Sequence, residues 1–221
     1  MTKSMLFNTE MVRALLDGRK SCTRRIIKDD VSAILNSPYH KAHPEVEDKQ
    51  ILCKLCMPPC IPGDILYVRE TWNTYCEGCL SKNLENILGS TCNHSCGENG
   101  NGYYYKATDK NHVKWHPSIH MPKEAARIWL KVTDVRVERL QDITPKGAES
   151  EGVGNLFYDD IGYGEKNYGT EVDTEYGIAK EQFAWLWEST IKKSDLDRYG
   201  WDANPWVWVI EFERCEKPEG V

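Results

Sequence analysis

The amino-acid sequence predicts a mixed α+β fold, and three observations lead to this prediction. Residues 65–72 and 127–140 alternate apolar with polar side chains, as half-buried strands do. Residues 180–191 place apolar side chains on one face of an amphipathic helix. The stretch 18–25 joins a helix to a strand. A chain of 221 residues can bury one sizeable core, so we expect a single domain over residues 1–221.

The composition limits where the protein works and what it binds. Charged residues make up 28% of the chain and hydrophobic residues 40%, as in ordinary globular proteins. The net charge of −6 argues against non-specific binding of a polyanion over the whole surface, but it leaves room for a local basic cleft. No stretch has the length and hydropathy of a signal peptide or a membrane span, so we expect a cytoplasmic protein without membrane contact.

The elements are expected in the following order along the chain. Asn8 is a candidate N-cap, and Gly18 is a candidate left-handed C-cap, of the first helix. Two prolines make residues 29–50 a long loop with at most a short helix at 31–35. The remaining expectations are strands at 4–7, 23–27, 65–72, 103–107, 127–140 and 206–212, helices from Pro145 to Gly152 and over 180–191, an insertion at 74–102, and a flexible acidic loop at 154–177.

The corner at residues 18–25 concentrates groups that can carry chemistry. In a strand, Lys20 and Thr23 would point to opposite faces, because side chains alternate with a period of two. They can meet if Lys20 lies in the turn and Thr23 opens the strand. Arg24 and Arg25 add positive charge beside them.

These residues also carry a resemblance to a known family. Gly18, Lys20, Thr23 and Arg25 match the G-x-K-x-x-T-x-R pattern of the ASCH domain family. Residues 62–72 and 115–122 resemble the P-G-D-x-L-x-V-R-E-T-W and W-x-P-S-I-H-M-P blocks of its phage and prophage members. The resemblance implies a PUA-like β-barrel flanked by helices, a fold linked to RNA and nucleoside recognition.

One branch of this family is an amidohydrolase that removes the acetyl group from N4-acetylcytidine. The resemblance implies Lys20, Thr23 and Glu151 as its catalytic residues, Glu151 coming from an A-x-x-E stretch. The chemistry is reasonable, because a lysine of lowered pKa can activate a threonine hydroxyl and a glutamate can orient the amine. In the alternative interpretation, Lys20 is a solvated turn residue, Thr23 an ordinary strand residue, and Glu151 pairs with an arginine.

A ligand would need more than the catalytic groups. Aromatic rings near strand ends or in loops can stack on a nucleobase. The candidate ligand-binding residues are Arg24, Arg25, Trp72, Trp115 and His120. The expected partner is RNA or a modified nucleoside. A non-catalytic phage protein, stabilised by zinc and acting through nucleic-acid or protein contacts, is the alternative function.

The chain has nine cysteines, and we do not expect them to form a disulfide framework, because cytoplasmic cysteines are normally reduced. Two closely spaced pairs in the insertion predict a structural zinc site, formed by Cys76, Cys79, Cys92 and Cys96. A second set, Cys53, Cys56 and Cys60, lacks a fourth ligand, which His43 or a later cysteine could supply. Alternatively, Cys53 and Cys56 pair with Cys76 and Cys79, so the sequence leaves one or two metal ions open.

Overall fold

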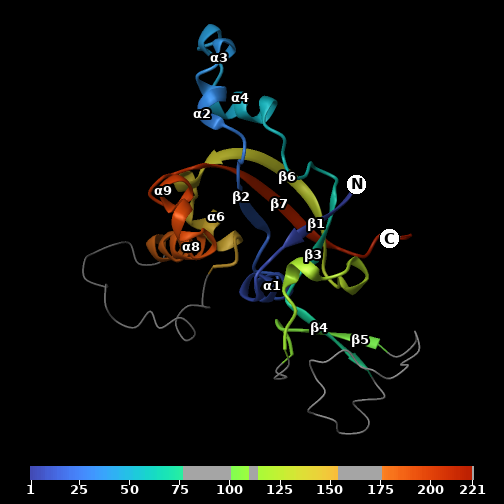
Figure 1. The fold of residues 1–221 in the computed structure, drawn as a ribbon. Helices are drawn as coiled ribbons and strands as arrows, with labels where there is room; N and C mark the ends of the chain where they lie inside the picture. Colours follow the sequence, from blue (N-terminus) through green and yellow to red (C-terminus); the bar gives the residue numbers. More distant parts are fainter. Residues whose placement is uncertain (77–100, 110–113, 154–175, 221) are drawn as a thin grey trace, which may run out of the picture. The chain divides into compact units, whose positions relative to one another are not determined.

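A computed structural model describes residues 1–76, 101–109, 114–153 and 176–220 and confirms the mixed α+β fold (Figure 1). Five strands form a mostly open sheet in the order β1-β3-β6-β7-β2. These strands are β1 (Thr2–Leu6), β2 (Cys22–Ile26), β3 (Ile65–Arg69), β6 (Trp129–Arg139) and β7 (Trp206–Cys215). β1 runs parallel to β3, and β2 runs antiparallel to β7. A second sheet pairs β4 (Trp72–Cys76) with β5 (Asn101–Tyr105).

Helices lie between consecutive strands of the five-stranded sheet along the chain. The α-helices are α1 (Thr9–Leu16), α2 (Val31–Leu35), α3 (Pro38–Ala42), α4 (Asp48–Leu55), α6 (Pro145–Ser150), α8 (Tyr176–Thr190) and α9 (Leu196–Tyr199). The 3-10 helices are η2 (Ser118–His120), η3 (Lys123–Ala125), η4 (Leu140–Asp142) and η5 (Lys193–Asp195). No helix among the described residues combines the length and the apolar character that crossing a membrane requires.

The chain divides into two compact units, each built from discontinuous segments. Unit 1 consists of Met1–Leu16, Ile65–Leu130 and Arg214–Val221, and unit 2 of Asp17–Asp64 and Lys131–Glu213. The division falls inside β6 and β7 rather than in a linker. The expectation of a single domain over residues 1–221 stays a prediction.

Several local predictions are confirmed by the backbone. The Asn8 side chain accepts a hydrogen bond from the Met11 amide at 2.8 Å and so caps α1. Gly18 has a φ of +73°, the left-handed conformation expected where this helix ends. At α6, the Thr144 hydroxyl accepts from the Gly147 amide at 3.0 Å, and Pro145 occupies the first helical turn.

The prediction for residues 29–50 is confirmed for the short helix at 31–35, which is α2, and wrong for the long loop around it. The chain there forms α2, α3 and the start of α4. Asp30 caps α2 through the Ala33 amide at 3.0 Å, and Ser37 caps α3 through the His40 amide at 3.3 Å. Pro38 follows Ser37 at the start of α3, where a missing N–H costs nothing. The proline therefore begins a helix instead of preventing one.

Each unit has its own apolar core. In unit 1, Met121, Ala125, Ala126 and Trp129 are buried together. In unit 2, α8 contributes Phe183 and Trp187, and the Trp187 ring nitrogen donates to the Tyr199 carbonyl of α9 at 2.7 Å. Figure 1 shows α6, α8 and α9 gathered in one group and α2, α3 and α4 in another. The α6 group covers the part of β2 that carries the candidate site.

Most of two predicted segments lies outside the described residues. The expected insertion at 74–102 is described only at its two ends, which belong to β4 and β5. The expected flexible loop at 154–177 is described only at its end, where α8 begins. Both expectations stay predictions.

Candidate active site

Lys20 and Glu151 form a buried ion pair in unit 2, although 131 positions separate them in the sequence. The Lys20 Nζ lies 2.7 Å from the Glu151 Oε2, and the two side chains are 1% and 4% exposed. The same ammonium donates to the Glu151 backbone carbonyl at 2.7 Å. A backbone bridge also joins the two residues. The structure therefore brings together two of the three predicted catalytic residues.

The local structure of α6 explains why Glu151 lies there. Glu151 is the C-cap residue of the helix, and Gly152 follows with a φ of +86°. The last carbonyls of a helix have no partner within it and carry the negative end of its dipole. The Lys20 ammonium satisfies one of these carbonyls, and the Arg19 guanidinium satisfies the next, that of Gly152, at 2.9 Å. The corner thus docks on the end of α6.

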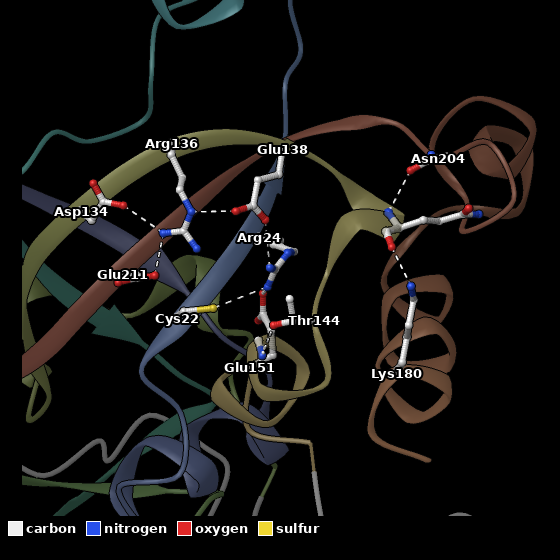
Figure 2. A network of polar contacts seen from close by, with 12 residues as sticks. Cys22, Arg24, Asp134, Arg136, Glu138, Thr144, Glu151, Lys180, Asn204 and Glu211 are labelled. Atoms are coloured by element: carbon white, nitrogen blue, oxygen red, sulfur yellow. Dashed lines mark hydrogen bonds and ion pairs between the residues drawn. The ribbon is translucent and has the colours of Figure 1, made fainter. Parts of the chain in front are cut away.

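Arg24 is the second cation on Glu151 (Figure 2). Its Nη1 lies 3.2 Å from the Glu151 Oε1, so each carboxylate oxygen has its own cation. Nη1 also donates to the Cys22 Sγ at 3.6 Å, and Nη2 lies 3.3 Å from the Glu138 Oε2. The Arg24 side chain is 3% exposed, and its guanidinium lies 5.7 Å from the centre of the Phe183 ring.

A more exposed group of charges continues from Glu138. Arg136 contacts Glu138 at 2.7 Å and Asp134 at 2.9 Å, and all three alternate along β6 (Figure 2). Arg136 also lies 2.6 Å from Glu211 of β7. Water screens these charges more than those of the buried pair. Sequence analysis missed this group, although charges at every second position of a strand indicate one charged face.

Burial controls how the groups of the corner titrate. Desolvation lowers the pKa of Lys20 below its ordinary 10.5, Glu151 opposes the shift, and the positive charge of Arg25 adds to it. Desolvation raises the pKa of the Cys22 thiol to about 12, so this cysteine is neutral. A lysine with a lowered pKa is suited to act as a base.

Thr23 and Arg25 lie on β2, and strand alternation places both on the face opposite to Cys22 and Arg24. Thr23 is buried and pairs with Ile210 of β7. No hydrogen bond of its hydroxyl is found within the described part of the chain. Arg25 is partly buried, which lowers its pKa, and the charge of Glu151 counteracts this. The charge of Arg25 therefore acts on the pKa of Lys20, and the charge of Glu151 acts on the pKa of Arg25.

The alternative interpretation of the corner is correct on one point and wrong on another. Glu151 does pair with an arginine, Arg24. Lys20, however, is buried and not a solvated turn residue. The helix end supplies two acceptors for its ammonium, which helps to accommodate the charge inside the protein.

The predicted ligand-binding residues fall into two groups. Arg24 and Arg25 belong to unit 2, whereas Trp72, Trp115 and His120 belong to unit 1. Trp72 exchanges backbone hydrogen bonds with His116 and packs its ring 5.3 Å from the His116 ring. Trp115 is partly buried and His120 is exposed. Their joint contact with one ligand stays a prediction.

The cysteine predictions are only partly covered by the structure. Cys79, Cys92 and Cys96 lie outside the described residues, and Cys76 ends β4. Cys53 is exposed, whereas Cys56 and Cys60 are buried. Burial and the neighbouring Asp29 raise the pKa of Cys56 to about 11. In the described ranges, no group of three or more His, Cys, Asp or Glu residues could hold a metal.

Comparisons with protein-family models, curated proteins and solved structures found no match to this chain. The function must therefore be argued from the geometry of the corner and from the sequence pattern that it contains. The geometry provides a buried amine of lowered pKa, a carboxylate shared by two cations, and a neighbouring strand that carries a hydroxyl and a further guanidinium.

Proposed function

We propose that this chain is an ASCH-like amidohydrolase that deacylates N4-acylated cytidine nucleosides, free or within RNA. The observation that carries the proposal is the buried Lys20–Glu151 pair, with Nζ and Oε2 2.7 Å apart. The pattern around Lys20, Thr23 and Arg25 supports it, because it resembles the ASCH signature. Perturbed titrating groups of this kind gather at catalytic sites more often than elsewhere.

In the proposed first step, which requires the Thr23 hydroxyl to come within hydrogen-bond distance of Nζ, the neutral Lys20 amine takes the proton of that hydroxyl. The Thr23 oxygen forms a bond to the acyl carbon of the substrate, and the carbonyl electron pair moves onto oxygen. The C–N bond then breaks, and Lys20 returns its proton to the departing N4 nitrogen. The products of this step are cytidine and a Thr23 ester.

In the second step, Lys20 removes a proton from water, and the resulting hydroxide attacks the ester carbon. The bond to Thr23 breaks, the hydroxyl is restored, and carboxylic acid leaves. Glu151 orients the amine throughout, since it holds Nζ through both its side chain and its carbonyl. Arg25 shares a strand face with Thr23 and is the candidate cation for the oxyanion.

The test is incubation of the purified chain with N4-acetylcytidine, followed by chromatography of the nucleoside. We expect release of cytidine by the wild type and loss of at least about a hundredfold in rate in Thr23→Val, Lys20→Met and Glu151→Gln. Lys131→Ala is the matched control, because the exposed Lys131 lies 3.9 Å from Glu213 in an ordinary surface pair. Turnover that survives in Thr23→Val would refute the nucleophile assignment.

One observation favours a binding function as the second candidate. Lys20 and Arg24 contact the buried Glu151 carboxylate, and Arg25 adds a third positive charge from the other face of β2, which together offer local positive charge to an anionic ligand. A non-catalytic protein of this kind would bind RNA or a modified nucleotide with an affinity that falls as salt rises. Absence of turnover in the wild type, together with salt-dependent RNA binding that Arg25→Gln weakens, would favour this function.

We also propose that the five-stranded sheet is part of a PUA-like barrel and that residues 74–102 hold a structural zinc ion. The chemistry of the four cysteines in that insertion supports the metal, since four thiolates suit tetrahedral Zn²⁺. Metal analysis of the purified chain should find zinc, and Cys79→Ser with Cys92→Ser should lose it. Retention of the metal in that variant would show that other residues bind the zinc ion.

A further inference from the structure

The contacts of Arg24 are more specific than packing alone requires. Its two terminal nitrogens reach Glu151, Glu138 and the Cys22 sulfur. Its Nε is buried and has no hydrogen-bond partner in the residues that the structure describes. A buried donor without a partner destabilises the fold, and an apolar side chain of similar size would avoid this cost. The positive charge of Arg24 is therefore the property to explain.

Charge balance gives the explanation. Lys20, Arg24 and Glu151 are all nearly inaccessible to water, and the two cations share one carboxylate. A guanidinium keeps its charge at every pH at which the protein is folded. With Glu151 ionised, these three buried groups together are neutral only when Lys20 has lost its proton, while Glu138, which also contacts Arg24, is 26% exposed and is shared with Arg136. Net charge is disfavoured in a buried environment, so Arg24 favours the neutral amine.

We propose that Arg24 is a positioning residue that holds Glu151, balances its charge, and thereby keeps Lys20 in the neutral form that a general base needs. This inference rests on the proposed acyl-transfer function and adds to it the residue that sets the working pH of the site. Arg24 acts through Glu151, which it contacts at 3.2 Å, and not on the substrate.

Glu138 opposes Arg24 and makes the proposal testable. It contacts Arg24 at 3.3 Å and Arg136 at 2.7 Å, and its side chain is 26% exposed. Its negative charge offsets part of the charge of Arg24. Removal of the Arg24 charge should therefore favour protonated Lys20, and removal of the Glu138 charge should favour the neutral amine. The surrounding charged or titratable groups are Arg19, Cys22, Arg25, Arg136, Glu138 and Glu211.

The experiment follows the protonation of Lys20 directly, without substrate. The full chain is labelled with ¹³C-lysine, the Cε resonance of Lys20 is recorded against pH, and Lys20→Arg assigns the resonance by its loss. We expect Arg24→Met to raise the titration midpoint by about one pH unit, as loss of a nearby like charge does. Glu138→Gln should lower it by a smaller amount, and Arg24→Lys should leave it close to the wild type.

Asp134→Asn is the matched control for Glu138→Gln. Asp134 lies on the same strand and contacts the same Arg136 at 2.9 Å, so its loss removes an equal charge from the outer group. The midpoint should stay unchanged in this variant. A shift equal to that of Glu138→Gln would overturn the specific role of Arg24 and Glu138. So would shifts of the same sign in Arg24→Met and Glu138→Gln, or no shift in either.

The result separates this inference from the proposed function. Opposite shifts without any turnover would support the positioning role and reject the hydrolase. Turnover without shifts would support the hydrolase and reject the role of Arg24. If Arg24→Met does not fold, comparison of the Lys20 titration midpoint in Glu138→Gln with that in Asp134→Asn decides whether the positioning role holds. In an active enzyme, the acidic limb of the kcat/KM profile should move in the same direction as the Lys20 midpoint.

Discussion

Each unit of the protein contains a deeply buried glutamate, and the two are paired differently. In unit 1, the partner of the Glu70 carboxylate among the described residues is Arg127, which donates two hydrogen bonds of 2.9 Å, Nε to Oε1 and Nη2 to Oε2. Arg127 remains 27% exposed and lies 3.9 Å from the centre of the Tyr105 ring. In unit 2, Glu151 is divided between Lys20 and Arg24, and all three side chains are at most 4% exposed.

The two glutamates differ in the balance of charge around them more than in the geometry of their hydrogen bonds. Glu70 and Arg127 neutralise each other, and a fork-to-carboxylate pair of this kind is a stable structural link. Glu151 is shared by two cations, of which Arg24 also contacts Glu138 and Lys20 is the one that can lose its proton. A balanced buried pair holds the fold, whereas an unbalanced one adjusts its protonation and can transfer protons. The proposed function therefore places chemistry at the corner of unit 2, and we expect the pair of unit 1 to be structural.

The largest effect on stability is expected from Glu151→Ala. The change leaves Lys20 and Arg24 buried beside each other without their carboxylate, which should lower the free energy of unfolding by about 3–5 kcal/mol. Urea unfolding followed by tryptophan fluorescence measures this. A loss below about 1 kcal/mol would show that the three groups are not an electrostatic unit.

Glu70→Ala should cost less, about 1–3 kcal/mol. Arg127 is partly exposed, so its guanidinium can turn to water and keep its contact with Tyr105. The same urea titration provides the measurement. If Glu70→Ala proved as costly as Glu151→Ala, the contrast between a balanced and an unbalanced pair would not explain the stability of either unit.

The pH dependence should have opposite signs at the two sites. The pKa of Lys20 is lowered, so the unfolded chain binds more protons between that value and 10.5, and the free energy of unfolding rises with pH there. The pKa of Glu70 is raised above 4.5 by burial, so the folded chain binds more protons and stability falls as pH rises through that pKa. The difference in the free energy of unfolding between the wild type and Lys20→Met, measured against pH, isolates the slope due to Lys20. The same difference between the wild type and Glu70→Gln isolates the slope due to Glu70. Slopes of equal sign would contradict the assignment.

The smallest effect is expected at the exposed pair of Lys131 and Glu213. The atoms are 3.9 Å apart and the side chains are 53% and 61% exposed. Lys131→Ala should change the free energy of unfolding by less than about 0.5 kcal/mol, because water and salt screen such pairs. This variant calibrates the others, and a larger loss would indicate a packing role for the lysine stem.

The sequence pattern predicted Lys20, Thr23 and Glu151 as one site, and it did not predict how Lys20 and Glu151 are held. The pattern around Gly18 predicted where α1 ends and β2 begins, because caps and strand alternation are local properties. It did not predict α3, since Pro38 was interpreted as a break although it stands at a helix start. Arg24 was expected to contact ligand, and the structure buries it against Glu151 and Glu138 instead. Its part as a ligand contact stays a prediction.

The sequence by itself determined the α+β class, the corner, and the residue types that could perform acyl transfer. The class and the corner follow from periodicity, turn residues and spacing, which act over a few positions, whereas the acyl-transfer residues are what the resemblance to the ASCH family implies. Only the tertiary structure decided that Lys20 meets Glu151 across 131 positions and that Arg24 competes for the same carboxylate. The physical reason is that desolvation and charge balance depend on which elements pack together, and a buried lysine acquires its lowered pKa only when the end of α6 covers it.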